Sequence, residues 1–473
     1  MKILIIGSGC REHALAWKFS LSEKVEKVFI APGNGGTALE NKCENVNLKA
    51  ADTALPGIQN ELVEFAQHEK VHLTVVGPEL PLAAGIADRF REAGLALIGP
   101  DQKSAQLESS KVYSKEFMNK YGIRTGKCKV FTDYDAAIHY AYNYFKINIP
   151  PKRDIAPEDD IAQEGDAVHV EDIAPLVIKA DGLAAGKGVV IVHDYTEAEN
   201  TLASFMKNES LGTAGRSVLL EEFLCGTEVS VLAAVSVRDG KGAILPFVSA
   251  RDHKRRFEGG QGPNTGGMGA IAPVPDFSHQ AQNDFMTAIL QPTLQGMIAE
   301  GMDYRGFIFF GLMVHKSRCN LLEYNVRLCD PETEAVLPLM DSDIVDLCTA
   351  ILNRTLDTFT LNWKNGAVCA PVAVAEGYPG TCRKGDPILV NWAALEKSGA
   401  KIFYGGISGT ATGDAAGGPE LFTNGGRVLA VSAHGSDAAK AWKSAYQGLE
   451  AVSFSGMSFR RDIGREEVPA AND

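Results

Sequence analysis

Short apolar runs alternate with helix-like patterns over residues 1–100. The runs predict buried β-strands, because each is rich in Val, Ile and Leu and is followed by Gly or Pro. They cover residues 2–7, 28–31, 72–77 and 95–99, and helical patterns lie near 13–19, 55–69 and 81–93. This alternation predicts a parallel sheet with helices on both faces, and ligands of such sheets bind beyond the carboxyl ends of the strands.

Three polar turns rich in Gly and Pro follow these strands, at residues 7–12, 32–34 and 77–79. The first begins like the dinucleotide motif G-x-G-x-x-G, but Glu12 replaces its third glycine and Asn34 stands where NAD binding needs an acid. A single phosphate at the helix N-terminus, helped by Arg11, fits these residues better. A tight turn without a ligand remains the alternative.

The segment 176–192, LVIKADGLAAGKGVVIV, predicts a β-hairpin with a glycine-rich turn. Lys179 lies inside the first strand, where a charge is costly unless a counter-charge meets it. Lys187 lies in the turn, whose glycines let backbone amides approach a polyphosphate closely. A Walker A loop is excluded, because three residues separate Gly182 from Gly186 and Gly188 follows Lys187. The alternative is a surface hairpin with solvated lysines.

A second group of elements surrounds this hairpin. A helix is predicted over 111–121, a strand over 127–131 and a helix over 133–145. Residues 147–175 are rich in Pro and acidic side chains and predict an exposed, mobile insertion. The strand 217–223 carries Glu221 and Glu222 on opposite faces, so that one of them can reach a ligand, and Glu228 is a further candidate.

Two further segments carry candidate chemistry. Residues 251–269 predict a long loop without regular structure, and loops of that length are usually functional or disordered. Along the strand 321–327, alternation places Glu323, Asn325 and Arg327 on one face. Glu and Asn oxygens suit Mg²⁺, and Arg327 can hold an anion with two parallel hydrogen bonds. A solvated sheet face is the alternative, and the preceding strand 307–314 offers no acid as a further ligand.

The last region shows strands at 368–376, 402–406 and 427–433 and a helix at 438–449, with a frayed end at 466–473. The length of 473 residues predicts about three domains. We expect a cytoplasmic protein, since no apolar run approaches the roughly 18 residues of a membrane span, no signal peptide pattern is present and the nine cysteines form no CxxC pair. A net charge of −13 argues against nucleic acid as a partner.

Nine segments occur in an order that resembles one family. The sequence is similar to the phosphoribosylamine–glycine ligases (GAR synthetases) of the ATP-grasp superfamily, and the similar segments span nearly the whole chain. They are GSGCREHALAW, APGNGGTALE, VVGPELPL, IKADGLAAGKGV, EEFLCGTE, DHKR, GPNTGGMGA, LEYNVRLCDPET and TNGGRVL. Cys10 and Cys329 stand where the family usually has glycine, and the acidic insertion lengthens the lid.

The resemblance implies a multidomain protein of the α/β and α+β classes. We expect an N-terminal parallel α/β domain over 1–103, a central ATP-grasp domain over 104–334 and a small C-terminal domain over 335–473. A mobile lid would cover about 124–195 and contain the insertion 147–175. The implied reaction converts ATP, glycine and 5-phosphoribosylamine into glycinamide ribonucleotide, ADP and phosphate through glycyl phosphate.

The resemblance also implies where ATP and its metal ion bind. Glu323 and Asn325 would hold Mg²⁺ or Mn²⁺. Lysines would surround the phosphates of ATP, and a hinge segment would meet its adenine and ribose. These lysines and hinge residues are Lys111, Lys179, Lys187, Glu221, Leu224 and Glu228.

Similar inferences apply to the other substrates. The 5′-phosphate of the ribosylamine would rest on the turn 7–12, and Arg327 with residues 330–333 would orient the carboxylate or acyl phosphate. No Ser or Cys nucleophile is needed. The implied catalytic residues are Lys187, Arg327, Asp252 and Lys254. The implied substrate-binding residues are Gly9, Arg11, Glu12, Asn34, Glu79, Gly266, Gly267, Met268, Arg327 and Asp330.

We expect a monomer with small-molecule substrates and with neither nucleic acid nor membrane as a partner. Another ATP-grasp carboxylate–amine ligase or carboxylase would share the phosphate chemistry. A NAD-dependent oxidoreductase is an alternative from another class, and NAD rather than ATP would protect it. A nucleotide sensor without catalysis is a further alternative, and it would bind ATP without releasing phosphate.

Overall fold

The computed structural model describes residues 1–147, 174–184, 188–410 and 419–465. Lys187, most of the predicted insertion 147–175 and the predicted frayed end 466–473 lie outside these residues. The chain forms two compact units. The large unit contains Met1–Ser109, Tyr113–Thr125 and Gly226–Asp473, and the small unit contains Ser110–Val112 and Gly126–Cys225.

The large unit begins with the parallel sheet that the sequence predicts. Its strands are β1 (Lys2–Gly7), β2 (Lys27–Pro32), β3 (Cys43–Asn45), β4 (Leu73–Val76) and β5 (Leu97–Pro100), paired in the order β3-β2-β1-β4-β5. Ile3 and Ile5 pack in the same core as α1 (Cys10–Ser20), whereas Leu4 and Ile6 pack with α2 (Pro56–His68) and α4 (Ile86–Glu92). Successive residues of β1 therefore serve helices on opposite faces, as predicted.

Two details of this region differ from the prediction. The sequence gives no strong signal for β3, which is only partly buried. The helix expected over 81–93 is divided into α3 (Glu79–Ala83) and α4, because Gly85 adopts a φ of 81° between them. Few residues other than glycine adopt that conformation at low cost.

The parallel strands continue into one sheet of 13 strands within the large unit. Strand β5 pairs antiparallel with β15 (Tyr304–His315), which also pairs with β10 (Thr227–Arg238) and β16 (Arg318–Asn325). The sheet then runs through β11 (Lys241–Asp252), β14 (Gly269–Ala272), β17 (Ala367–Val374), β22 (Arg427–Gly435) and β19 (Lys401–Tyr404). Segments that the sequence assigns to three domains thus share hydrogen-bonded strands.

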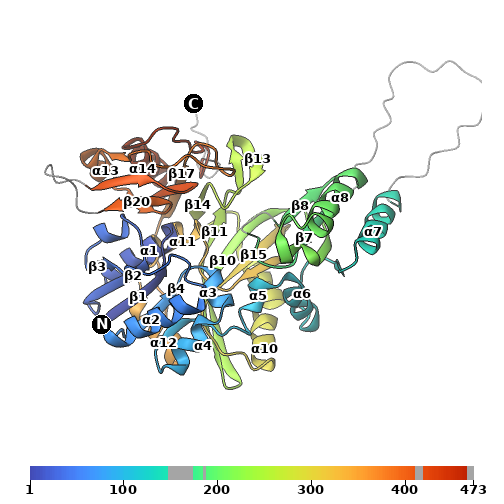
Figure 1. The fold of residues 1–473 in the computed structure, drawn as a ribbon, viewed down its shortest axis with the longest axis horizontal. Coiled ribbons are helices and arrows are strands. Elements are labelled where there is room, and N and C mark those ends of the chain that lie inside the picture. Colours follow the sequence, from blue (N-terminus) through green and yellow to red (C-terminus); the bar gives the residue numbers. More distant parts are fainter. Residues whose placement is uncertain (148–173, 185–187, 411–418, 466–473) are drawn as a thin grey trace, which may run out of the picture. The chain divides into compact units, whose positions relative to one another are not determined.

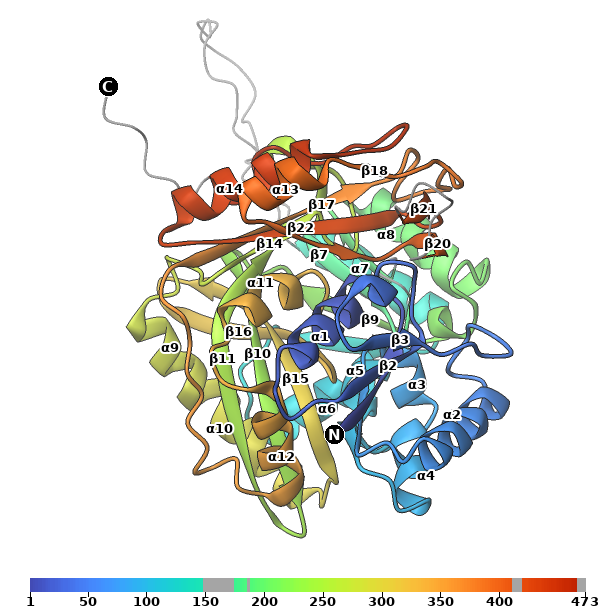
Figure 2. The ribbon, with the colours of Figure 1, turned by 90° about the vertical axis from the view of Figure 1, so that its left-hand side faces the viewer.

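Helices cover this sheet where its strands are apolar. Helix α14 (Ala438–Glu450) buries Ala441, Ala445 and Leu449, and Figure 2 shows it with α13 (Trp392–Ser398) beside β17 and β22. Helix α11 (Glu332–Leu339) packs against α1, and α12 (Ile344–Asn353) packs against β10. The remaining long helices of the described part of this unit are α6 (Lys111–Lys120, whose first two residues belong to the small unit), α9 (His279–Phe285) and α10 (Gln291–Ala299).

The prediction that residues 251–269 form a loop without regular structure is wrong in one respect, because the segment contains a hairpin. Strands β12 (Arg255–Phe257) and β13 (Gln261–Asn264) pair antiparallel, and Gly259 and Gly260 turn the chain with φ values of 65° and 68°. The residues of β13 are exposed. Without a buried face the hairpin has no hydrophobic alternation, so the pattern of apolar residues gives no sign of it.

The small unit is a four-stranded antiparallel sheet with two helices (Figure 1). Its order is β6 (Cys128–Phe131), β9 (Val218–Glu222), β7 (Leu176–Ala180) and β8 (Val189–Val192), and the pairing of β7 with β8 confirms the predicted hairpin. Helices α7 (Tyr134–Ile147) and α8 (Tyr195–Leu202) share a core with alternate residues of β7, Leu176 and Ile178 among them. Lys179 therefore lies on the face that turns away from this core.

No helix in the described ranges has both the length and the apolar character that crossing a bilayer requires.

Candidate active site

In the small unit, the buried Lys179 has the counter-charge that the sequence requires. Its ammonium lies 2.6 Å from the Glu221 carboxylate, and both side chains are largely buried. Glu222 points to the other face and accepts a hydrogen bond of 2.8 Å from the Lys127 backbone N–H. The prediction that the two adjacent carboxylates occupy opposite faces of the strand is thus confirmed, and Glu221 is the one that meets a cation.

Lys111 lies beside the start of the glycine-rich turn. The Asp181 carboxylate, which directly follows β7, accepts hydrogen bonds from the Ser110 hydroxyl at 3.1 Å and from the Val112 backbone N–H at 3.2 Å. These two bonds fix the backbone on either side of Lys111. Leu224 follows β9 and is half-buried, and Lys187 lies outside the described residues.

In the large unit, the Arg327 guanidinium is surrounded by polar partners. It lies 2.8 Å from Glu108 and 3.5 Å from Glu79, and it donates hydrogen bonds to Asn325 Oδ1 at 3.2 Å and to Cys329 Sγ at 2.5 Å. Arg327 lies beyond the end of β16, not within the strand as expected, but its bond to Asn325 keeps the two side chains on one side. Together with Arg11, Arg327 forms what we call the arginine cluster, whose members are Arg11, Glu12, Glu79, Glu108 and Arg327.

The charges of the arginine cluster stabilise one another. Burial alone would lower the pKa of Arg327, but Cys329 and Glu108 outweigh this effect and raise the pKa. Burial alone would raise the pKa of Glu79, but Arg327 and Arg11 lower it. Glu108 is more deeply buried, and there burial prevails and raises the pKa in spite of Arg327.

Glu12 holds the turn 7–12 in shape. Its carboxylate accepts a hydrogen bond of 2.5 Å from the Gly9 backbone N–H and lies 2.6 Å from Arg11 Nε. A Cβ at Gly77 would approach Glu12 Oε1 to 1.9 Å, so this neighbouring turn must lack a side chain there. Arg11 also donates to the Leu328 carbonyl at 3.0 Å, which connects the turn to the segment that contains Arg327.

The side chain of Asn34 is occupied by backbone partners. Its amide nitrogen donates to the Ser8 and Tyr404 carbonyls at 2.7 and 3.0 Å, and its oxygen accepts from the Gly36 and Thr37 backbone N–H groups at 2.8 and 3.0 Å. Asn34 therefore joins the turns 7–12 and 32–34 to β19 of the C-terminal region.

A second group of charges, which we call the lysine cluster, lies around Lys254. Lys254 Nζ is 2.6 Å from Glu228, and although burial would lower its pKa, Glu228 and Glu323 raise it. Burial and the neighbouring Glu332 raise the pKa of Asp252, and burial also raises that of Glu332, whose carboxylate accepts a hydrogen bond of 2.8 Å from the Ser230 hydroxyl. The cluster consists of Glu228, Asp252, Lys254, Glu323 and Glu332.

The donor set around Lys254 fits a divalent metal ion. Four carboxylates surround Lys254, and they still outnumber the cations when Arg427, which acts on Asp252, and Arg327, which acts on Glu332, are included. Glu323 and Asn325 alternate with the buried Tyr324 on β16 and so share a face of the sheet, as predicted. Carboxylate and amide oxygens are the ligands that Mg²⁺ and Mn²⁺ accept, and the residues present therefore fit such an ion.

The loop that carries Gly266, Gly267 and Met268 lies over Asp252. Gly267 adopts a φ of 115°, and a Cβ there would come within 2.6 Å of Asp252 Oδ1 and 2.4 Å of Pro331 Cδ, so only glycine fits. Met268 is fully buried, its backbone N–H donates to the His253 carbonyl and its carbonyl accepts from Val372 N–H. Neither its side chain nor these two backbone groups face an open surface.

Arg427 connects this loop to Asp330. Its Nη1 donates to the Gly266 carbonyl at 2.5 Å and lies 2.9 Å from Asp330 Oδ1, while Tyr378 accepts a hydrogen bond of 2.9 Å from Gly266 N–H. The sequence predictions missed Arg427, Tyr378 and Glu108, and they included Glu332 only as part of residues 330–333. Arg427 lies within the family-like segment TNGGRVL and could have been chosen, but Tyr378 and Glu108 carry no such signal.

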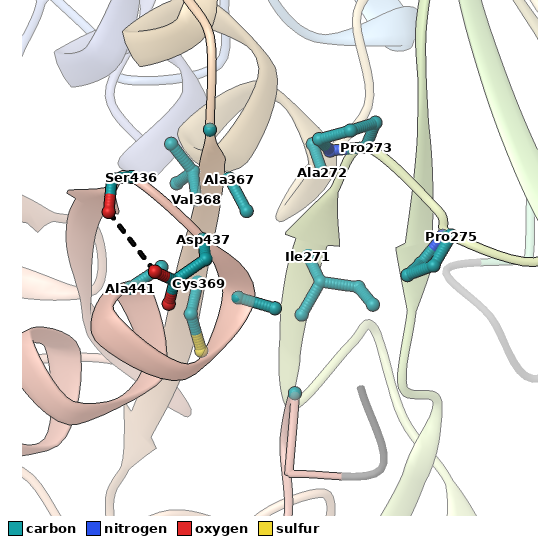
Figure 3. A pocket seen from close by; sticks show the side chains of 13 residues that line it. Ile271, Ala272, Pro273, Pro275, Ala367, Val368, Cys369, Ser436, Asp437 and Ala441 are labelled. Atoms are coloured by element: carbon teal, nitrogen blue, oxygen red, sulfur yellow. Dashed lines mark hydrogen bonds between the residues drawn. The ribbon is translucent and has the colours of Figure 1, made fainter. Parts of the chain in front are cut away.

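An apolar cavity of about 210 Å³ occurs elsewhere in the large unit (Figure 3). Ile271 and Ala272 of β14, Val368 and Cys369 of β17 and Ala441 of α14 line it. None of the predicted site residues borders this cavity.

Comparison with known proteins assigns all three regions to one family. Models of the phosphoribosylglycinamide synthetase N domain, ATP-grasp (A) domain and C domain match residues 1–108, 109–333 and 367–466. The phosphoribosylamine–glycine ligase of Clostridium acetobutylicum is 44% identical over 470 residues, which are 99% of this chain and 100% of that protein.

Solved structures agree with this assignment. The crystal structure of a phosphoribosylamine–glycine ligase from Thermotoga maritima has a TM-score of 0.76 and 31% identity, and the match covers 98% of this chain and 100% of that one. A biotin carboxylase from Campylobacter jejuni shares the fold, with a TM-score of 0.67, 15% identity and coverage of 99% and 95%. The structure thus has an N-terminal region, a central ATP-grasp region and a C-terminal region in a mixed α/β architecture.

Proposed function

Because the chain belongs to the phosphoribosylglycinamide synthetase family, it is a carbon–nitrogen ligase of purine synthesis that joins glycine to phosphoribosylamine, and we propose how its residues divide this work. ATP, glycine and 5-phosphoribosylamine give glycinamide ribonucleotide, ADP and phosphate. The ATP-grasp fold binds ATP together with a divalent metal ion.

The chemistry requires activation of glycine first. A carboxylate does not acylate an amine in water, so a glycine oxygen forms a bond to the γ-phosphorus of ATP while the bond to ADP breaks. Such phosphoryl transfer depends mainly on positioning and on neutralisation of charge. The protein therefore needs cations at the phosphates, a cation at the glycine carboxylate and an acceptor for the proton of the attacking amine.

Lys179 and Lys111 supply cations at the ATP phosphates in this proposal. The support is that Lys179 is buried, paired with Glu221 and turned away from the helices of the small unit, and that Asp181 fixes the backbone around Lys111. Lys187 remains a prediction from the sequence for the same role. Glu221, Leu224 and Glu228 are proposed to meet adenine and ribose.

Glu323 and Asn325 would hold Mg²⁺, with Mn²⁺ as an equally suitable ion. The bound ion neutralises phosphate charge during transfer. The excess of carboxylates in the lysine cluster supports this placement, and Lys254 supplies the only cation among the five residues of that cluster.

Arg327 is proposed to hold the glycine carboxylate and then its acyl phosphate. The observation that carries this assignment is the geometry of its guanidinium, which Glu108, Asn325 and Cys329 hold in place beside the proposed metal ligands. A planar guanidinium held in this way matches the two oxygens of a carboxylate. Arg427 and Asp330 position the neighbouring glycine-rich loop.

The amine of phosphoribosylamine then attacks the acyl carbon, the new C–N bond forms and phosphate leaves. Asp252 is proposed to accept the proton that the amine loses, because its raised pKa makes it a stronger base than an ordinary carboxylate and its Oδ1 has no hydrogen-bond partner among the described residues. No thiol is required, and burial raises the pKa of Cys10 and Cys329, which disfavours the nucleophilic thiolate.

The turn 7–12 is proposed to receive the 5′-phosphate, with Glu79 near the sugar. Glu12 and Asn34 act on this subsite through the turns that they hold, since their side chains are bonded to Gly9 N–H, Arg11 and the backbone. The proposal also retains a monomer and a cytoplasmic location. All nine cysteines are present as thiols rather than disulfides, which is consistent with a reducing compartment.

A phosphate-release assay tests the proposed function. ATP with both glycine and phosphoribosylamine should release phosphate, and omission of either substrate should reduce the rate at least tenfold. Lys187→Ala should abolish glycine-dependent ADP formation while circular dichroism stays unchanged. Release at the full rate without the ribosylamine, or with bicarbonate in place of glycine, would contradict the proposal and favour a different ATP-grasp activity.

A further inference from the structure

Three potential metal ligands meet where α1 and α11 begin. Cys10 is the first residue of α1, Asp330 lies in the turn before α11 and Glu334 lies in the first turn of α11. The Cys10 sulfur and one carboxylate oxygen from each acid all lie within 4.8 Å of one another. Cys10 is 3% exposed and Glu334 0% exposed, whereas the side chain of Asp330 is 15% exposed and provides access from solvent.

Glu334 is the unusual member of this group. Neither of its carboxylate oxygens has a hydrogen-bond partner in the described part of the protein. Buried carboxylates are normally paired or hydrogen-bonded, because an isolated charge is expensive to bury. Arg427, whose charge acts on Glu334, bonds to Asp330 instead. Burial and the Asp330 charge raise the pKa of Glu334, more than its own backbone amide and Arg427 lower it.

We propose that Cys10 Sγ and the carboxylates of Asp330 and Glu334 form a binding site for a thiophilic divalent cation, best represented by Zn²⁺. One sulfur and two carboxylate oxygens are a ligand set that Zn²⁺ accepts, whereas Mg²⁺ has little affinity for sulfur. Three protein ligands leave a fourth position for water. The site is different from the proposed Mg²⁺ ligands Glu323 and Asn325.

The geometry requires only a small closure. Bonds of about 2.3 Å to sulfur and about 2.1 Å to oxygen place ligand atoms roughly 3.5 Å apart around a tetrahedral ion. The present spacing is up to 4.8 Å, and rotation of the carboxylate side chains would shorten it towards that value. Glu334 is available for this movement, because no other described residue hydrogen-bonds to its carboxylate oxygens.

Binding must release protons. The Cys10 thiol loses its proton as the Zn²⁺–thiolate bond forms, and Glu334, where it is protonated, loses one as well. The ion then balances the negative charge of three ligands, which Arg427 alone does not. Zinc affinity should therefore rise with pH.

The consequence for activity rests on the proposed function. Asp330 belongs to the proposed substrate site and shares Arg427 with the glycine-rich loop. An ion on Asp330 competes with that arrangement, so Zn²⁺ should inhibit the ligase. The binding itself does not depend on which reaction the protein catalyses.

Competition with a chromophoric zinc chelator on the full chain tests the binding. Zn²⁺ should bind the wild type with one site that Glu334→Gln and Cys10→Ser each weaken at least tenfold. Co²⁺ should give a thiolate charge-transfer band that Cys10→Ser removes. Cys348→Ser is the matched control, because Cys348 is also buried but lies in α12 outside the cluster, and it should bind as the wild type does.

Activity without zinc separates the two proposals. Glu334→Gln and Cys348→Ser should then keep wild-type phosphate release, and Glu334→Gln should require at least tenfold more Zn²⁺ for half inhibition. Zinc binding that neither variant weakens, for example at the exposed Cys225, would overturn the site. Should Cys10→Ser fail to fold, Glu334→Gln alone decides. A wild type that binds zinc but never releases phosphate would contradict the proposed function and leave the site intact.

Discussion

The arginine cluster and the lysine cluster of the large unit treat charge in opposite ways. The arginine cluster contains two cations and three carboxylates, and both arginines have raised pKa values. The lysine cluster contains one cation and four carboxylates, two of which have raised pKa values. The first cluster is nearly balanced in charge and its members are paired with one another, which suits the placement of a substrate anion. The second lacks positive charge, which suits a metal ion and a proton acceptor.

This difference shows why a count of ion pairs does not identify a site. Buried pairs cost desolvation as well as gaining attraction, so each is weak evidence for stability. The informative quantity is the charge that remains after pairing. The substitutions below change this unpaired charge in each cluster, and they are ordered by the size of the expected effect.

Replacement of Arg327 should have the largest effect. Arg327→Ala removes the proposed carboxylate-binding group and leaves Glu108 buried without its partner at 2.8 Å. We expect kcat/KM for glycine to fall by about a thousandfold or more, since several hydrogen bonds of about 1.5–3 kcal/mol are lost, and the free energy of unfolding to fall by about 3–5 kcal/mol. Phosphate release and urea unfolding measure the two effects.

Arg327→Lys separates charge from geometry. A lysine keeps the positive charge near Glu108 but cannot form the paired bonds of a guanidinium. Stability should therefore recover to within about 1–2 kcal/mol of the wild type, whereas activity should remain low. Full activity with lysine would show that Arg327 acts only as a point charge.

Replacement of Glu323 should have the next largest effect. Glu323→Gln removes one charge from the proposed metal site, and the Mg²⁺ concentration for half-maximal activity should rise about 10- to 100-fold. A Mg²⁺ titration of phosphate release measures this shift, and Glu26→Gln, at an exposed position, is the control. An unchanged titration would move the metal site away from β16.

A matched pair of substitutions compares the clusters directly. Glu108→Gln leaves the buried Arg327 without the carboxylate 2.8 Å away and weakens the bond from the Val326 N–H, so the unfolding free energy should fall by about 1–3 kcal/mol, although the raised pKa of Glu108 offsets part of this loss. Glu332→Gln should be neutral or slightly stabilising at pH 8, because the lysine cluster already has excess negative charge. Urea unfolding of both variants checks the contrast, and equal losses would show that the clusters do not differ in balance.

The pH dependence of the effect of Glu332→Gln follows from the pKa of Glu332. The pKa of Glu332 is higher in the folded protein than in the unfolded chain, so its contribution to stability is present below the unfolded pKa and is lost as pH rises. The advantage of Glu332→Gln should thus be greatest at pH 8 and should disappear near pH 4.

Much of the backbone arrangement was predictable from the sequence, because it depends on local patterns. Alternation placed Glu323 with Asn325 and separated Glu221 from Glu222, and the burial of Lys179 required the counter-charge that Glu221 provides. The hairpin around the glycine-rich turn follows from two apolar runs of strand length. In each case the periodicity of a single segment contains the information.

The rest depends on contacts between distant segments. The pairing of β5 with β15 joins residues about two hundred positions apart, and Val326 N–H reaches Glu108 across 218 positions. No periodic pattern in either segment specifies its partner. The occupied hydrogen bonds of Asn34 and the burial of Met268 were likewise hidden, since a residue type alone does not show whether its polar groups face a ligand or the protein.

Replacement of His253 should have the smallest effect, and this effect on the free energy of unfolding should depend on pH. It lies between Asp252 and Lys254, and burial lowers its pKa from 6.5 to about 4. A lowered pKa means that the neutral form is favoured on folding, so the stabilisation is complete above pH 6.5 and is lost as pH falls towards 4. Because the side chain is partly exposed, we expect a loss of about 1–2 kcal/mol from this residue.

His253→Gln tests this expectation, because the glutamine side chain is uncharged at every pH. Other groups titrate in the same range, so the relevant measurement is the difference in unfolding free energy between variant and wild type at several pH values from 7 to 4. That difference should change by about 1–2 kcal/mol in favour of the variant as pH falls. His279→Gln, at an exposed position, is the matched control. A His253 variant with the same slope would mean that this part of the lysine cluster is open to water, and that Asp252 beside it is too well solvated to act as a base near neutral pH.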